Sequence, residues 1–309
     1  MGCQLRPEFT ELRFPALAGA LLAAVLTALT LEVPLVAAER QLQDVVYSKA
    51  KDADQVRNSL DVYAPAKGAD LPIMVWIHGG GWKRGSKELV DRKVTAFNER
   101  GFVLVSINYR FTPAVTYHEQ GTDVARAIAW VHEHAAEFGG SRDKIFVMGH
   151  SAGAHLAALV STDHRYLEAE KLSLATIQGA VLLDGAGYDV PRQIEIAALP
   201  ALKELYIDAF GTDPLKQKDA SPISHVAKEK QIPPFLILHI ASRRDGKLQS
   251  ESLAKAINEA GGSAKVYSAA GKTHGTINRE LGLAGDAPTK EVFGFLEAQL
   301  KRLASKSKP

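Results

Sequence analysis

A serine in the middle of the chain has the surroundings of a catalytic nucleophile. Gly149-His150-Ser151-Ala152-Gly153 forms the pattern G-x-S-x-G, and it lies between the apolar run "KIFVMGHS" and an alanine-rich segment with helical character. In this motif the serine sits on a sharp strand-to-helix turn, and the flanking glycines let the strand and the helix approach each other. A helix N-cap would account for the serine but not for both glycines. The motif therefore predicts Ser151 as a nucleophile.

A serine hydroxyl needs a base and an acid that orients the base. With this motif the two partners follow the serine in the order Asp or Glu, then His. His274 lies in the glycine-flanked loop "AAGKTHGTIN" and is predicted as the base. Asp245 lies in the loop after "PFLILHIA" and is predicted as the acid. Asp184, at the end of "AVLLDG" one strand earlier, is the alternative acid.

The stretch "WIHGGGWKRGSK", residues 76–87, places three glycines after an apolar run. Gly80 and Gly85 have the spacing of a phosphate-binding P-loop, but Ser86-Lys87 stands where that motif needs Lys followed by Ser or Thr. The other interpretation is an oxyanion hole, built from backbone N–H groups that face the negative oxygen of an acyl-transfer intermediate. With Ser151 as nucleophile, the second interpretation is favoured, and Gly80, Gly81 and Ala152 are the predicted donors.

The pattern of apolar runs predicts the elements that must position these residues. "DVVYS" and "NSLDVYAP" alternate with period two and indicate an antiparallel hairpin. Continuous apolar runs, typical of strands buried on both faces, alternate with helical segments such as residues 88–100 and 119–138. We therefore expect one α/β domain over residues 39–309, with a mostly parallel sheet covered by helices on both faces. The long irregular stretch 185–233 is expected to form a small lid-like excursion.

Composition narrows the function further. The chain has 309 residues and a formal net charge of +2, and no basic run precedes the C-terminal "KRLASKSKP", so nucleic acid is not an expected partner. We predict neither a metal site nor an organic cofactor. Cys3 is the single cysteine, so removal of a leader would leave no thiol for a disulfide or a nucleophile.

The first part of the chain has the pattern of an export leader. Residues 14–31 form an uncharged apolar run, and the small residues Val36 and Ala38 fit a signal-peptidase site, with the mature chain starting at Glu39. We therefore expect residues 1–38 to be a signal peptide and the protein to be exported, periplasmic or secreted. An uncleaved membrane anchor is the alternative, because the run approaches the length that spans a bilayer.

Taken together, HGGGW, "NYR", GHSAG, the late Asp and the late His resemble the α/β-hydrolase carboxylesterases of the hormone-sensitive-lipase and feruloyl/acetyl-xylan esterase-like groups. The resemblance covers residues from about 43 to 303. It implies the α/β-hydrolase fold and hydrolysis of carboxylic esters through an acyl-enzyme, with a small-molecule or polymer-edge ester as substrate. The residues it implies are the triad Ser151, Asp245 and His274 and the oxyanion hole Gly80, Gly81 and Ala152.

Two other functions remain open at this point. Kynurenine formamidases have the similar motif HGGxW, matched by residues 78–82, although the predicted leader argues against a cytosolic metabolite as substrate. A catalytically silent scaffold is the alternative from another class, but such proteins normally lack a triad residue. The hormone-sensitive-lipase group usually has an N-terminal cap, and none is expected here. The chain is therefore more similar to compact, uncapped esterases.

Overall fold

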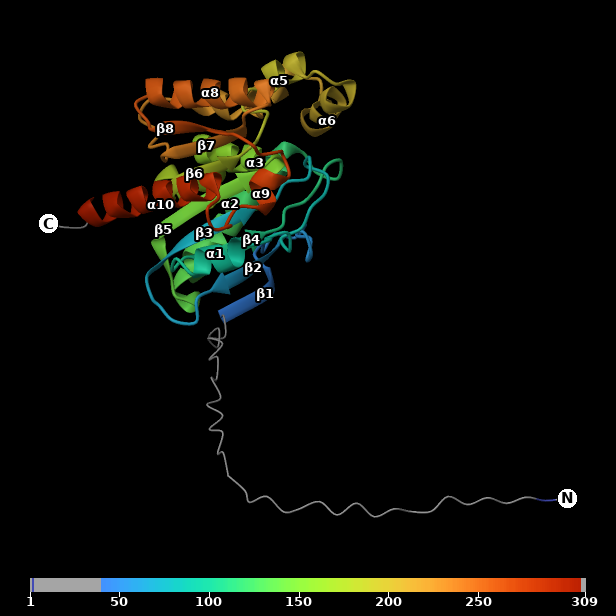
Figure 1. The fold of residues 1–309 in the computed structure, drawn as a ribbon. Helices are drawn as coiled ribbons and strands as arrows, with labels where there is room; N and C mark the ends of the chain where they lie inside the picture. Colours follow the sequence, from blue (N-terminus) through green and yellow to red (C-terminus); the bar gives the residue numbers. More distant parts are fainter. Residues whose placement is uncertain (1, 3–39, 307–309) are drawn as a thin grey trace, which may run out of the picture. The chain divides into compact units, whose positions relative to one another are not determined.

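The computed structural model describes residue 2 and residues 40–306, and the chain is coloured along its sequence in Figure 1. The predicted leader over residues 1–38 thus falls outside the described residues, apart from Gly2. Within the described part, no helix has both the length and the hydropathy needed to cross a bilayer.

The centre of the fold is an eight-stranded sheet with the order β1-β2-β4-β3-β5-β6-β7-β8. Strand β2 pairs antiparallel with both β1 and β4, and every other neighbouring pair is parallel. The predicted N-terminal hairpin and mostly parallel sheet are confirmed. The strands are β1 Arg40–Val46, β2 Ser59–Ala64, β3 Leu71–Ile77, β4 Val103–Ile107, β5 Gly140–His150, β6 Ile177–Leu183, β7 Phe235–Ile240 and β8 Ala264–Ala269.

Helices cover both faces of the sheet, as predicted. The helical elements are α1 Lys93–Asn98, α2 Tyr117–His134, η1 Ala135–Phe138, α3 Ala152–Thr162, α4 His164–Ala169, η2 Leu174–Thr176, α5 Val190–Ile196, α6 Pro200–Phe210, α7 Pro214–Asp219, η3 Pro222–His225, α8 Arg244–Glu259, α9 Thr276–Arg279 and α10 Ala287–Lys306. Alternate residues of a strand face opposite sides. Val75 accordingly packs in a core cluster with α2, α3 and α8, whereas Trp76 packs in a second cluster with α1 and α10.

Two predicted segments differ from the structure. The helix expected over residues 88–100 shortens to α1, because the chain before it turns where Lys87 enters the interior and binds Asp61. The stretch 185–233, expected to be irregular, contains the short helices α5, α6 and α7. Its Asp and Pro residues begin helices here: Asp189 and Asp213 cap α5 and α7 through their side chains, and a proline lies in the first turn of each of the three helices.

The parallel strands bring the predicted chemistry to one edge. The segments that carry the three glycines, Ser151, Asp184 and His274 follow β3, β5, β6 and β8 respectively. Carboxyl ends of parallel strands meet at the same edge of an open sheet, which is where such folds place their ligands. The order of the strands therefore builds a single site from segments that are far apart in the sequence.

Candidate active site

The turn that carries Ser151 needs both glycines of its motif. Ser151 has φ 56° and ψ −120°, a conformation outside the helix that follows it. A Cβ on Gly149 would lie 2.2 Å from the carbonyl oxygen of Gly153. A Cβ on Gly153 would lie 2.2 Å from the carbonyl oxygen of Ile77, on β3. No side chain fits at either position, so the strand, the helix and the serine can meet only with glycine at both places.

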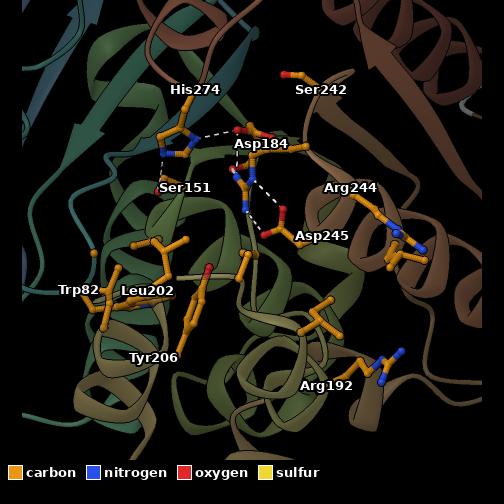
Figure 2. Close-up of a pocket in the computed structure, with 18 residues that line it drawn as sticks. Trp82, Ser151, Asp184, Arg192, Leu202, Tyr206, Ser242, Arg244, Asp245 and His274 are labelled. Carbon is orange, nitrogen blue, oxygen red and sulfur yellow. Dashed lines mark hydrogen bonds and ion pairs between the residues drawn. The ribbon is translucent and has the colours of Figure 1, made fainter. Parts of the chain in front are cut away.

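His274 faces the serine, as predicted. Its Nε2 lies 3.0 Å from Ser151 Oγ, within hydrogen-bond distance (Figure 2). The backbone of His274 is held by His150, whose Nε2 lies 2.8 Å from the carbonyl oxygen of His274. Burial, together with the nearby His274 ring, lowers the pKa of His150 to about 3. His150 is therefore neutral near pH 7, and because its partner is a carbonyl, its Nε2 carries the proton and donates it.

The other ring nitrogen of His274 binds Asp184. The distance from His274 Nδ1 to Asp184 Oδ2 is 2.6 Å, and the Asp184 side chain is fully buried. The carboxylate also accepts hydrogen bonds from the Ile240 N–H and from Arg243 Nη1. Burial raises the pKa of Asp184, but the His274 hydrogen bond and the charge of Arg243 outweigh it and hold the pKa below its usual value. Asp184 is thus a carboxylate that orients the imidazole.

The predicted pairing of Asp245 with His274 is wrong. Asp245 lies on the first turn of α8, and its carboxylate oxygens bind Arg243 at 2.8 and 3.3 Å and Gln193 at 3.2 Å. An arginine two residues away satisfies this carboxylate locally. Asp184 instead follows β6 directly, and β6 lies beside β5, the strand that Ser151 follows. The alternative acid of the sequence analysis is the one that the structure joins to the histidine.

Two features of the sequence pointed to this outcome. Asp184 stands directly after an apolar run and before a glycine, a place where the chain turns. The structure gives it a left-handed backbone conformation with φ 44°, which Asp tolerates better than most residues. Asp245 follows two arginines, Arg243 and Arg244, so a local ion pair was available to it. Chain order alone could not separate the two acids.

The three predicted oxyanion donors, Gly80, Gly81 and Ala152, differ in how they border the cavity. Gly81 and Ala152 line the same cavity as Ser151. Among the residues that the structure describes, none accepts a hydrogen bond from the backbone N–H of Gly81 or Ala152. Gly80 is outside the cavity lining: a Cβ there would lie 1.9 Å from the carbonyl oxygen of Arg84, and its φ is 128°. Gly80 therefore shapes the turn, and its backbone N–H, like those of Gly81 and Ala152, has no acceptor among the described residues, so all three stay candidate donors.

A cavity of about 730 Å³ opens on the serine, the histidine and two of the three candidate donors. Figure 2 shows Trp82, Leu202 and Tyr206 gathered on one side of it, below Ser151. Leu202 and Tyr206 belong to α6, and Ile196 of α5 adds to the apolar lining. The helical segment between β6 and β7 lies within the stretch 185–233, for which a lid-like excursion was predicted, and it forms a wall of the cavity. The expectation that an N-terminal cap is missing concerns residues outside the described part. Among the described residues, no three His, Cys, Asp or Glu side chains are grouped as metal ligands.

Comparisons with known proteins agree with this geometry. The BD-FAE family model matches residues 60–256. The chain is 35% identical over 176 residues to the probable carboxylic ester hydrolase LipM of Mycobacterium tuberculosis, covering 54% of this chain and 40% of LipM. It is 34% identical over 256 residues to esterase LipQ of the same organism, covering 77% of this chain and 59% of LipQ. The match thus spans about half the length of these curated relatives.

Solved structures show the same architecture. Esterase B from Lactobacillus rhamnosis superposes with a TM-score of 0.72 at 20% identity, over 88% of this chain and 90% of that one. The thermophilic esterase Est2 of Thermogutta terrifontis superposes with a TM-score of 0.64 at 26% identity, over 87% of this chain and 93% of that one. The predicted α/β-hydrolase fold is confirmed.

Proposed function

Because the chain belongs to the BD-FAE family, we propose that this protein is a serine hydrolase that cleaves carboxylic esters through an acyl-enzyme. The observation that carries the proposal is the continuous chain of contacts from Ser151 Oγ to His274 and on to the buried Asp184, which opens on the cavity. The names of the relatives, carboxylic ester hydrolase and esterase, support the same reaction class.

In the first half of the reaction, Ser151 Oγ attacks the ester carbonyl carbon and its proton passes to His274 Nε2, 3.0 Å away. Negative charge then develops on the former carbonyl oxygen. The proposed donors to that oxygen are the N–H groups of Gly80, Gly81 and Ala152, of which Gly81 and Ala152 line the same cavity as Ser151. Loss of a single donor of this kind costs other enzymes about a hundredfold to a thousandfold in turnover.

The first half ends when His274 returns the proton to the departing alcohol oxygen, the alcohol leaves and the acyl-enzyme remains. A water molecule then gives a proton to His274 as its oxygen attacks the acyl carbon, and the acid leaves when Ser151 takes the proton back. Throughout, Asp184 holds the Nδ1–H of His274 and stabilises the imidazolium that forms twice in each cycle. Its burial removes competing water from that hydrogen bond.

A panel of p-nitrophenyl esters of rising chain length tests this function. Because α5 and α6 give the cavity an apolar wall, kcat/KM should rise by about fourfold for each methylene that the wall buries, and level off when the wall is covered. Leu205→Ala removes part of this wall and should flatten the rise. Leu215→Ala is the matched control, because Leu215 on α7 is exposed and outside the cavity lining. An unchanged slope in Leu205→Ala would place the acyl chain elsewhere.

The same panel separates ester hydrolysis from the alternatives. It should include feruloyl esters, acetylated sugars and an N-formyl anilide. We expect the wild-type protein to prefer an aryl acetate to the formanilide, because the cavity wall is built for an acyl chain longer than formyl. Faster cleavage of the formanilide would instead identify an arylformamidase. A protein that hydrolyses none of these compounds would be a silent scaffold.

We also propose that the protein is exported, on the basis of the apolar run over residues 14–31 and the small residues Val36 and Ala38. Expression of the full chain in a bacterial host should yield a periplasmic or secreted protein whose N-terminal sequence begins at Glu39. Recovery of the uncleaved chain in the membrane fraction would favour the anchor.

A further inference from the structure

The guanidinium of Arg243 joins two carboxylates beside the catalytic histidine. Its Nη1 lies 3.0 Å from Asp184 Oδ2 and 3.3 Å from the Asp184 carbonyl oxygen. On its other edge, Nη2 lies 2.8 Å from Asp245 Oδ2 and Nε 3.3 Å from Asp245 Oδ1. Figure 2 shows the row of contacts that runs from Ser151 through His274 and Asp184 to Asp245. The site therefore contains two linked groups that a simple triad does not need.

Arg243 and His274 bind the same oxygen atom. Asp184 Oδ2 accepts from His274 Nδ1 at 2.6 Å and from Arg243 Nη1 at 3.0 Å. With the Ile240 N–H on Oδ1, the Asp184 carboxylate has three donors. Arg243 also holds the backbone carbonyl of this residue, whose φ of 44° lies in the left-handed region. Arg243 thus fixes both the side chain and the backbone of the residue that orients the imidazole.

A positive charge at this place also opposes protonation of His274. Asp245 carries a negative charge on the far edge of the guanidinium and compensates it. Burial raises the pKa of Asp245, but the hydrogen bond and the charge of Arg243 outweigh it, so the pKa falls below its usual value. Burial lowers the pKa of Arg243, and the two carboxylates raise it further than burial lowers it. Asp184, Arg243 and Asp245 therefore carry one net negative charge, the same as an isolated triad aspartate.

We propose that the Arg243–Asp245 ion pair positions Asp184 and balances the charge beside His274, and thereby sets the lower end of the pH range in which the enzyme is active. The inference rests on the proposed serine-hydrolase function. Asp245 in addition accepts a hydrogen bond from Gln193 on α5, so the ion pair also joins the catalytic histidine to the helical wall of the cavity. Arg243 and Asp245 are positioning residues in this account, since neither contacts the reacting serine.

The other titratable groups around His274 do not change their charge over the acid side of the pH profile of kcat/KM. His150 on β5 is neutral there, since its pKa is lowered to about 3 by burial and by His274. Lys93 on α1 donates to the Asn278 carbonyl in α9, and burial lowers its pKa only to about 8, so it stays charged. The Arg279 side chain of α9 lies beside Gly275, where an added Cβ would be 2.8 Å from Arg279 Nη1. Burial raises the pKa of Tyr206 on α6 to about 12, so Tyr206 stays neutral.

Single replacements of Arg243 and Asp245 should move the acid limb of the pH profile, where kcat/KM falls as the pH is lowered, in opposite directions. Arg243→Met removes the positive charge, so the imidazolium becomes easier to form and the limb should move to higher pH by about 0.5 to 1 unit. Asp245→Asn leaves the positive charge of Arg243 less compensated, so the limb should move to lower pH by a similar amount. The double variant restores one net negative charge, and its limb should return toward that of the wild type. Arg243→Lys keeps the charge and should stay near the wild-type limb.

A matched control exists at another place in the fold. Arg165 binds Asp163, also two residues away, through two nitrogens, and neither residue lines the cavity. Arg165→Met should alter stability without moving the acid limb. A purely structural role of Arg243 would change rate and stability but leave every limb in place, and that result would overturn the inference. Shifts of the same sign in Arg243→Met and Asp245→Asn would overturn it as well. If the wild type hydrolyses esters but the variants do not shift the acid limb, only this inference is overturned and the proposed serine-hydrolase function stands. A wild type without ester hydrolysis overturns both proposals.

Discussion

Ser151→Ala is expected to lower kcat for a p-nitrophenyl ester by about five to six orders of magnitude, leaving only the contribution of the oxyanion donors and of substrate binding. The substitution removes one oxygen atom, whose partner in the structure is His274 Nε2. No other described residue near the site offers an oxygen in that position, so the attack on the ester carbonyl has no substitute. Initial rates at pH 8 with purified wild-type and variant protein measure the loss.

Two measurements keep this result interpretable. The variant should unfold within a few degrees of the wild type, because Ser151 Oγ binds nothing in the core and Ala152 and Gly153 are unchanged. A fluorophosphonate probe should label the wild type at Ser151 and leave the variant unlabelled. A variant that retains a tenth of the wild-type rate, or a probe attached to another serine, would remove Ser151 from the mechanism.

Local patterns predicted the parts of the site that depend on one segment each. Gly149 and Gly153 are required because any side chain would collide with backbone 2.2 Å away, so the motif around Ser151 could be recognised without the fold. Among the three glycines after β3, Gly80 has the same property, since a Cβ there would lie 1.9 Å from the Arg84 carbonyl oxygen. His274 was identifiable because its loop follows the last strand and is flanked by glycine. The glycines were recognisable because only glycine fits at these positions, and His274 because of its place in the chain.

The acid could not be predicted in this way because its assignment depends on a competition between side chains. Asp184 and Asp245 both follow strands that end at the active-site edge, and both are aspartates. What separates them is Arg243, which takes up both oxygens of Asp245 but leaves Asp184 Oδ2 within reach of His274. The lid-like excursion over residues 185–233 was predicted, but its helices were not, for a related reason. The Asp and Pro residues of the stretch 185–233 read as turn formers, although at the first turn of a helix the same residues begin it.

Asp184→Asn is expected to lower kcat by about ten-thousandfold with little change in KM. An amide keeps the shape of the carboxylate but removes the negative charge that stabilises the imidazolium in both halves of the reaction. The amide has only one oxygen to accept the hydrogen bonds of His274, Arg243 and Ile240, so its NH2 group must face at least one of these donors. If the amide oxygen takes the Oδ1 position, where it accepts from the Ile240 N–H, the amide nitrogen takes the Oδ2 position and faces both Arg243 Nη1 and His274 Nδ1. The nitrogen then donates to His274 Nδ1 and holds the wrong tautomer, with the proton on Nε2, where it cannot accept from Ser151.

The matched comparison is Asp245→Asn, measured on the same aryl ester at the pH optimum of each variant. Asp245 contacts Arg243 and Gln193 and does not contact His274, so its loss should cost within about tenfold in kcat, through the changed charge of the ion pair. Thermal unfolding of both variants is needed, because a buried amide against Arg243 can lower stability by about 1 to 3 kcal/mol. Both proteins must therefore be assayed well below their melting temperatures. If Asp245→Asn is the inactive variant and Asp184→Asn remains active, then the contact between His274 and Asp184 is not the one that supports catalysis, and the acid is Asp245 after all.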